Sequence, residues 1–435
     1  MRRESPVVTC VGLNHLTSPV EEREKLAFSA TELVSALPAF GAQLGGAVLL
    51  STCNRTELYA TSERGHGPLL VDLLNRTKGT EIERSRFYVL EHRDAVRHLF
   101  RVAAGVDSMV LGESQILGQV REAMSAATGA NTLNGVLSRA FHSAIAVGKR
   151  ARTETSIGRH PVSVSSAAVA LARRALGDLS GKTVLVIAAG SMGKLAAKSL
   201  AAQTGSRILV VNRSQERAEG LAEEIGPAAQ AISFSGLPDA LSRADIVISG
   251  TSAEGFIVGV DDVRPVMASR GGRGLLFIDV AVPRDIDPEV RRVPGVHLYD
   301  IDDIEAVTSE GWNGRQGEVK RVESIVDEEV AAFMDWWRSL DVVPVISALR
   351  ERAETIRRHE LERLLSRLPD LDEESRRRID AMTTAIVKKM LDRPISRLKD
   401  GADKGLYMEA LQDLFDAKPG YTDVMRGNPS LDSRR

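Results

Sequence analysis

The middle third of the chain alternates short β-forming runs with helical patterns, and this alternation restricts the fold more than any other feature. Four runs rich in Val, Ile and Leu cover residues 183–187, 207–211, 245–249 and 275–280. Helix-like segments separate them. Strands that alternate with helices form a parallel sheet with helices on both faces. The sequence therefore predicts a doubly wound, Rossmann-like α/β domain over residues 156–304.

A turn that contains two glycines follows the first of these strands and opens a helix. It reads Ala188-Ala189-Gly190-Ser191-Met192-Gly193, a dinucleotide-binding fingerprint with its first glycine replaced. Gly190 would let the backbone approach a pyrophosphate, and the helix N-terminus would offer it free N–H groups. We therefore expect these six residues to bind a dinucleotide. An ordinary strand-to-helix turn is the alternative.

The end of the second strand of this domain indicates which dinucleotide is bound. It reads Asn212-Arg213-Ser214, where an NAD site would place Asp or Glu on the ribose 2′-hydroxyl. A carboxylate would repel a 2′-phosphate, whereas a guanidinium and a hydroxyl can bind one. These three residues therefore favour binding of NADPH over NADH. The alternative is that Arg213 is a solvated loop residue.

The flanking parts of the chain have different patterns. Residues 7–13 and 47–51 are typical of buried strands, and a helix is expected near 29–37 between them, which predicts a βαβ beginning. From Asp94 onwards the apolar residues recur at helical spacing. We expect an α+β domain over 1–155.

Beyond 304 only helical stripes occur, from Val319 to Trp337 and from Ile346 to Ile356. They predict a helical linker and dimerisation domain over 305–418, with an intrachain helical cap as the alternative, and a disordered tail over 419–435.

Composition sets the class of protein. At 435 residues, roughly 150 residues per domain predicts about three domains. No apolar run approaches the ~20 residues of a membrane span, and the start of the chain is unlike a signal peptide, so we expect a cytoplasmic location. Cys10 and Cys53 are the two cysteines, which excludes a disulfide framework or a multi-thiolate zinc site within one chain. With a net charge of -2, the chain as a whole does not attract nucleic acid, so RNA would have to be held by local basic patches.

A dense polar run, Ser51-Thr52-Cys53-Asn54-Arg55-Thr56-Glu57, follows the second predicted strand. Strand ends are where rigid scaffolds present chemical groups. In extended backbone Cys53 and Arg55 share a face, although a turn here would break that alternation. A neighbouring guanidinium favours the thiolate. The alternative is a buried structural cysteine, as expected for Cys10. A nucleophilic thiol with a nicotinamide site predicts acyl transfer to sulfur and then reduction of the thioester by hydride.

Several motifs, in order along nearly the whole chain, resemble those of the glutamyl-tRNA reductases. They are Gly12-Leu13-Asn14-His15, Ser51 to Glu57, Asp107-Ser108-Met109-Val110-Leu111-Gly112-Glu113, Gln115-Ile116-Leu117-Gly118-Gln119-Val120, Arg152-Thr153-Glu154-Thr155, Ile278-Asp279-Val280-Ala281-Val282-Pro283-Arg284-Asp285-Ile286 and Leu298-Tyr299-Asp300-Ile301-Asp302-Asp303. Two positions depart from the family pattern: Ala188 replaces a glycine, and Ser114 stands where many members carry Pro.

The resemblance implies roles for individual residues. Cys53 matches the nucleophile, and His98 matches a histidine important for activity, which is expected to assist thiolate formation or the hydride step. Thr52, Asn54 and Arg55 match the loop that grips the glutamyl group, whose carboxylate suits a guanidinium. The remaining substrate-contacting positions are matched by Ser108, Glu113, Ser114, Gln115 and Gln119.

The activity implied is NADPH-dependent reduction of glutamyl-tRNA to glutamate-1-semialdehyde, the first step of tetrapyrrole (porphyrin and haem) biosynthesis, without a metal. The implied partners are glutamyl-tRNA, a second copy of the chain and the downstream semialdehyde aminotransferase. Candidate RNA contacts are Lys149, Arg150 and Arg152, or the run 376–378. Two alternatives remain: a reductase of acyl phosphates or acyl-coenzyme A, and a non-catalytic dimeric sensor of NADP(H).

Overall fold

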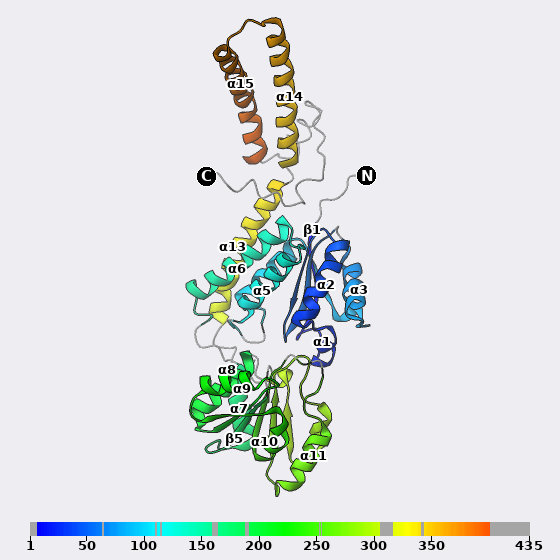
Figure 1. The fold of residues 1–435 in the computed structure, drawn as a ribbon, viewed down its shortest axis with the longest axis vertical. Coiled ribbons are helices and arrows are strands. Elements are labelled where there is room, and N and C mark those ends of the chain that lie inside the picture. The colour runs from blue at the N-terminus through cyan, green and yellow to red at the C-terminus, as the bar shows by residue number, and fades with distance from the viewer. Residues whose placement is uncertain are drawn as a thin grey trace. The chain divides into compact units, whose positions relative to one another are not determined.

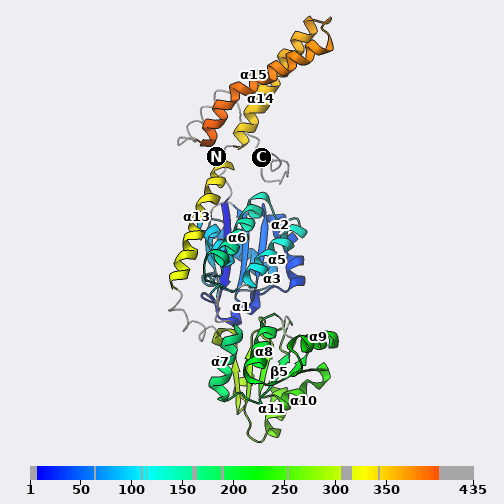
Figure 2. The same cartoon turned by 90° about the vertical axis from the view of Figure 1, so that its left-hand side faces the viewer.

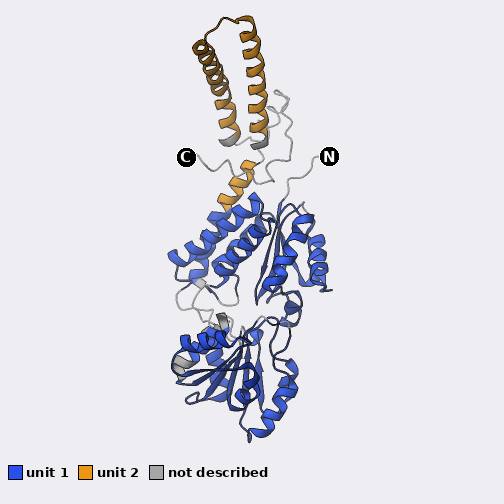
Figure 3. Ribbon diagram, in the orientation of Figure 1, with its two compact units in different colours: residues 1–330 blue, residues 331–435 orange. Residues whose placement is uncertain are grey.

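The structure is a computed structural model that describes residues 7–62, 65–108, 111–113, 115–158, 164–187, 191–251, 253, 255–304, 316–340 and 343–400. Contacts within the chain define two compact units, residues 1–330 and 331–435 (Figure 3). Three of the predictions lie outside the described residues: the cofactor contacts of Ala188, Ala189 and Gly190, the substrate contact of Ser114, and the disordered tail.

The N-terminal domain is built on a four-stranded antiparallel sheet. Its strands are β1 (Val7–Asn14), β2 (Ala47–Ser51), β3 (Arg55–Ser62) and β4 (Tyr88–Glu91), in the order β2-β3-β1-β4. The two strands predicted here exist, but β3, which was not predicted, lies between β1 and β2 and is antiparallel to both. β1 and β2 are therefore parallel to each other, and the predicted βαβ beginning is confirmed, with β3 inserted between its two strands.

Helices pack on both faces of this sheet (Figure 1). They are α1 (Val20–Leu26), α2 (Ala30–Gln43), α3 (Gly67–Lys78), α4 (Arg93–Ala104), α5 (Gln115–Gly129) and α6 (Gly135–Glu154). Leu37 and Phe40 of α2 pack with Val11 and Leu49 on one face. Because side chains alternate along a strand, Tyr59 points to the other face, where its ring meets the ring of Phe141 on α6 edge-on, 5.4 Å between centroids.

The middle domain is a six-stranded parallel sheet. Its strands are β5 (Thr183–Ile187), β6 (Arg207–Val211), β7 (Ala229–Ile232), β8 (Ile246–Ser249), β9 (Leu275–Asp279) and β10 (Val296–Tyr299), in the order β10-β9-β8-β5-β6-β7. The strand order reverses between β5 and β8, which is where open α/β sheets bind ligands, at the carboxyl ends of the strands. The predicted doubly wound domain is confirmed.

Two apolar layers cover this parallel sheet. One layer comprises α7 (Val164–Leu176), α8 (Ser191–Thr204) and α9 (Gln215–Ile225), and the other comprises α10 (Leu237–Arg243) and α11 (Val260–Ser269). Val184 and Val186 of β5 belong to the first layer, whereas Leu185 and Ile187 belong to the second. Burial on both faces explains why this strand is a continuous apolar run.

The remaining helices are α13 (Gln316–Leu340), α14 (Val343–Arg367) and α15 (Glu373–Asp400). The part of α13 within the first unit runs beside α6 (Figure 2), and Glu323 pairs there with Arg97 (2.6 Å) and Arg101 of α4. Charged pairs thus hold α13 to the N-terminal domain.

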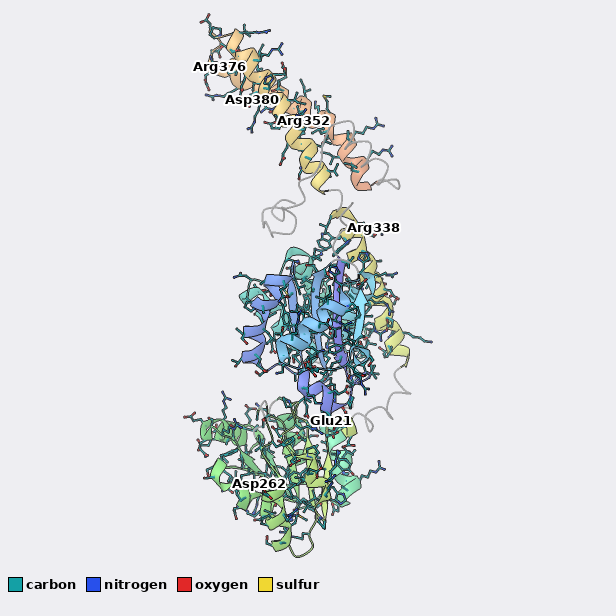
Figure 4. The ribbon with its side chains drawn as sticks, turned by 90° about the vertical axis from the view of Figure 1, so that its right-hand side faces the viewer. Glu21, Asp262, Arg338, Arg352, Arg376 and Asp380 are labelled. Atoms are coloured by element: carbon teal, nitrogen blue, oxygen red, sulfur yellow. The ribbon has the colours of Figure 1, made fainter. Side chains whose placement is uncertain are left out.

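The second unit contains a helical hairpin, which confirms the predicted all-helical C-terminal domain. Leu349 of α14 and Leu398 of α15 are buried in its core, whereas charged side chains such as Arg352 and Asp380 project from it (Figure 4). Further apolar side chains on the hairpin are exposed, among them Ile356, Met382, Ile386 and Met390. Among the described helices, none combines the length and apolarity that a membrane crossing requires.

Candidate active site

Cys53 lies in the tight turn that joins β2 to β3. The Thr52 hydroxyl accepts hydrogen bonds from the backbone N–H groups of Asn54 and Arg55, both at 3.2 Å. The Thr52 backbone N–H also donates to the Arg55 carbonyl at 2.8 Å. This turn breaks the extended alternation, so Cys53 and Arg55 do not share a face as an uninterrupted strand would require.

Cys53 lines a cavity of about 880 Å³ together with residues of the middle domain. The N-terminal domain contributes Gln115 and Gln119, and the middle domain contributes Gly193, Asn212, Arg213 and Ser214. The structure therefore brings together the predicted nucleophile, two predicted substrate contacts and four predicted cofactor contacts. Of the other cofactor candidates, Ser191 and Met192 begin α8.

A buried charged cluster lies beside the Cys53 turn, centred on Glu57 of β3. The Glu57 carboxylate accepts hydrogen bonds from Arg55 Nη1 (2.7 Å), Tyr59 Oη (2.6 Å) and Tyr88 Oη (2.5 Å). His98 Nε2 lies 2.9 Å from the same carboxylate, and His98 Nδ1 lies 3.0 Å from Asp107 Oδ2. Burial alone would raise the pKa of Glu57, but His98 and Arg55 hold it far below its usual range.

His98 carries a positive charge in this arrangement. Burial opposes the charge, but Glu57 and Asp107 outweigh burial and raise the pKa of His98 to about 9. An imidazolium with both nitrogens bound to carboxylates cannot accept a proton from Cys53 at neutral pH. The expectation that His98 assists thiolate formation as a base is not supported by this geometry.

The surroundings of the Cys53 sulfur favour its protonated form. Burial raises the pKa of its thiol to about 12, Glu113 adds to the rise, and Arg23 and Arg55 oppose it. Arg55 does lower the pKa of the thiol, as predicted, but burial outweighs its effect, and Arg55 is engaged elsewhere. Its Nη1 binds Glu57, its Nη2 donates to the Asp107 carbonyl, and its side chain is 1% exposed.

Of the charged groups around Cys53, Glu113 has the largest effect on the pKa of its thiol, which it raises. Burial raises the pKa of Glu113 to about 7, with Arg152 and Arg55 opposing the rise. The backbone here is fixed: Arg152 Nη2 donates to the Glu113 carbonyl at 2.6 Å, and Gly112 has a φ of +78°. A Cβ on Gly112 would lie 1.9 Å from the Ile157 carbonyl oxygen, so only glycine fits.

Several buried polar atoms near this turn have no hydrogen-bond partner within the part of the chain that the structure describes. They are Asn54 Oδ1, Ser108 Oγ, Gln115 Oε1, and the Nε and Nη1 atoms of Arg23. Leaving such groups unpaired costs about 1–3 kcal/mol each, so this site is suited to a polar ligand. The first three belong to predicted substrate contacts.

Arg23 was not predicted. It lies on α1 with 2% of its side chain exposed, and its third nitrogen, Nη2, pairs with Asp302 of the middle domain. Its neighbours Glu21, Glu22 and Glu24 are typical of a solvated helix face, so no local pattern indicated that a cation would be buried there.

Cys10, Glu57 and His98 have ligand-type atoms within 4.8 Å of one another. The two Glu57 oxygens already interact with Arg55, Tyr59, Tyr88 and His98. A metal would displace these interactions, so the cluster is better described as a hydrogen-bonded network.

The end of β6 can receive part of a nicotinamide dinucleotide. Asn212 Oδ1 accepts the Ser214 backbone N–H at 3.0 Å, and Ser214 Oγ accepts the Arg217 N–H at 3.3 Å as the cap of α9. Arg213 is exposed at the cavity wall. These residues follow β6, the strand beside β5, and carry no carboxylate, so they suit part of a nicotinamide dinucleotide.

The basic residues suggested as RNA contacts are largely engaged within the chain. Arg150 pairs with Glu154 and Glu329, both at 2.8 Å, and Arg152 donates to three backbone carbonyls. Arg378 pairs with Glu374 at 2.5 Å. The structure therefore does not support Arg150 and Arg152 as contacts for phosphates, whereas Lys149 and the run 376–378 stay a prediction.

Comparison with known proteins assigns the family. Family models match the N-terminal domain of glutamyl-tRNA reductase at residues 11–155, shikimate/quinate 5-dehydrogenase at 170–307, and the dimerisation domain of glutamyl-tRNA reductase at 321–417. The glutamyl-tRNA reductase of Pelotomaculum thermopropionicum is 46% identical over 418 residues, 94% of either chain. The chain belongs to the glutamyl-tRNA reductase family.

Further relatives agree with this membership. The Geobacter sulfurreducens glutamyl-tRNA reductase is 44% identical, covering 94% of this chain and 96% of its own. The solved structure of the Methanopyrus kandleri glutamyl-tRNA reductase is 36% identical with a TM-score of 0.50, covering 94% of this chain and 98% of that one. The helical hairpin α14–α15 lies within the range matched by the family's dimerisation domain.

Proposed function

We propose that this protein reduces the glutamyl group of glutamyl-tRNA to glutamate-1-semialdehyde, with NADPH as reductant and a thioester on Cys53 as intermediate. This reaction is the first step of tetrapyrrole biosynthesis by the five-carbon route. The observation that carries the proposal is the cavity of about 880 Å³, in which Cys53 meets Asn212, Arg213 and Ser214 at the nucleotide end of the middle domain.

The first step forms a bond between the Cys53 sulfur and the glutamyl carbonyl carbon and breaks the ester bond to the ribose oxygen. The thiol must lose its proton, and Glu113, whose pKa is about 7, is suited to accept it and to return it to the departing ribose oxygen. A thiol with a pKa of about 12 stays protonated until the substrate arrives, which protects it from adventitious reaction.

The second step converts the thioester to an aldehyde and frees the thiolate. A bound NADPH would supply the hydride for this reduction, held by the α8 N-terminus at Ser191, Met192 and Gly193 and by Asn212, Arg213 and Ser214. The preceding turn residues Ala188, Ala189 and Gly190 belong to the same proposal. Because Glu113 has already given its proton to the ribose oxygen, the Cys53 thiolate takes a new proton from solvent, which Glu113 can relay, and this completes the cycle.

The unpaired buried atoms support a site for the glutamyl group. Its ammonium group requires acceptors, which Asn54 Oδ1 and Gln115 Oε1 supply, and its free carboxylate requires donors, which Arg23 Nε and Nη1 supply. Arg55 holds the turn through Glu57 and Asp107, while Thr52 fixes the loop. Ser108, Ser114 and Gln119 complete the proposed substrate contacts.

Two copies of the chain are proposed to form the active enzyme. The hairpin α14–α15 exposes Ile356, Met382, Ile386 and Met390, which a second hairpin could cover. The downstream aminotransferase remains a proposed partner.

The test is incubation of the purified protein with glutamyl-tRNA and NADPH, with the aldehyde measured directly. We expect product with wild type and none with Cys53→Ser, whereas the matched control Cys10→Ser retains activity. Uncharged tRNA with free glutamate is the substrate control. Undiminished aldehyde from the Cys53→Ser variant would refute the thioester. Equal activity on glutamyl-coenzyme A after ribonuclease treatment would favour an acyl-coenzyme A reductase instead.

A further inference from the structure

Cys53 also lines a second cavity, of about 540 Å³. The residues that line this second cavity come from α1, α2, the β2–β3 turn and α3 on one side, and from the segments near 256 and 283 of the middle domain on the other. They include Phe28, Ser29, Glu32, Thr52, Lys78, Phe256, Pro283 and Arg284. Arg213 and Ser214, which fit the dinucleotide, line the larger cavity and are not among the residues that line the second one.

The reaction requires two ligands beside the Cys53 sulfur, and the two cavities provide space for both. Before the thioester forms, the acyl carbon carries a leaving group; after it forms, the acyl carbon needs a reductant. Because the larger cavity contains the residues suited to the dinucleotide, the second cavity is free for the leaving group. Both ligands can then meet the same sulfur without competing for one space.

The walls of the second cavity suit a neutral ring system with hydroxyl groups. Phe256 is 52% exposed, which leaves its ring available for stacking, and the Lys78 ammonium lies 5.1 Å from the Phe28 ring centroid. The two cations in its walls are paired: Lys78 with Glu32 at 2.5 Å, and Arg284 with Glu24 at 2.8 Å and Glu21 at 2.7 Å. With their charges neutralised, these walls favour a nucleoside over a phosphate.

We propose that the second cavity binds the terminal nucleoside of the RNA that carries the glutamyl group, with its base stacked on Phe256. Glu32 and the hydroxyls of Ser29 and Thr52 offer partners for the ribose and the base. Aromatic side chains stack on bases of any sequence, so the subsite reads the presence of a nucleoside. This inference rests on the proposed function, because it assumes an aminoacyl-RNA substrate.

Equilibrium binding to uncharged RNA tests the subsite without turnover. The probes are tRNA-Glu with its 3′-terminal nucleoside and the same RNA lacking it. We expect the wild type to bind the complete RNA about 5- to 100-fold more tightly, the range that one base–aromatic stack gives. Phe256→Ala should abolish this difference, and Phe256→Tyr should restore it. A difference that persists in Phe256→Ala would overturn the proposal, as would equal binding of the two RNAs by wild type.

Steady-state kinetics provide a second readout. Phe256→Ala should raise the KM for glutamyl-tRNA by a similar factor and leave the KM for NADPH unchanged. The matched control Phe234→Ala removes another exposed ring, at the wall of the larger cavity, and should leave the KM for glutamyl-tRNA unchanged. Slower aldehyde release with unaltered RNA affinity would make the second cavity a product exit and overturn our assignment. An inactive wild type that still distinguishes the two RNAs would refute the proposed function alone.

Discussion

Replacing His98 with Gln should destabilise the N-terminal domain in a strongly pH-dependent way. The substitution removes a positive charge held between Glu57 and Asp107, at 2.9 and 3.0 Å, in a side chain that is 11% exposed. A rise of the pKa from 6.5 to about 9 corresponds to roughly 3 kcal/mol of stability.

The direction of the pH dependence follows from the raised pKa. Because the folded protein binds this proton more tightly than the unfolded chain, the contribution is complete below pH 6.5 and is lost as pH rises through about 9. The difference in unfolding free energy between wild type and His98→Gln should therefore fall from roughly 3 kcal/mol at pH 6 towards zero near pH 10.

Urea unfolding, followed by circular dichroism at several pH values, gives this difference, and NMR titration of labelled histidine gives the pKa directly. His142→Gln is the matched control, since His142 is also on a helix but exposed. A stability difference that grows with pH, or a measured pKa at or below 6.5, would refute the assignment of His98 as an imidazolium.

Three further predictions concern single side chains. In a Cys10→Ser background, Glu113→Gln should speed alkylation of Cys53 by iodoacetamide, because a charge that raises the thiol pKa is lost. The same substitution should slow single-turnover thioester formation at least tenfold. Slower alkylation would contradict this prediction. Arg213→Ala should raise the KM for NADPH about 10- to 100-fold but hardly change that for NADH; an equal rise for both would exclude a 2′-phosphate contact. Met390→Lys should shift the protein towards monomer in light-scattering chromatography, whereas Lys389→Ala should not; an unaltered dimer would place the interface elsewhere.

The parallel sheet could be predicted because its strands are buried on both faces and are therefore apolar throughout. The same rule failed for β3, Arg55–Ser62, whose first residues are polar and charged yet buried. Burial of Glu57 depends on Tyr88, His98 and Arg55, and two of these are distant in the sequence. A local pattern contains no information on such partners.

The residues that make up the site were predicted more accurately than their ionisation states. Cys53, Gln115 and Gln119 do line one cavity, as the motifs indicated. The ionisation of Cys53 could not be predicted, because the neighbour in sequence, Arg55, is directed to Glu57 and Asp107. Arg23 was missed because burial of a helix face depends on the docking of Asp302.

The hairpin β2–β3 carries both the sulfur, at its tip, and the buried charged cluster, along its second strand. Any backbone change that repositions Cys53 must also disturb a fully enclosed carboxylate and its four partners. Attempts to alter which acyl group the protein accepts should therefore leave this hairpin intact. Variation is better directed to Gln115 and Gln119 of α5, which line the same cavity as Cys53, because exchanging these uncharged side chains exposes no buried ion.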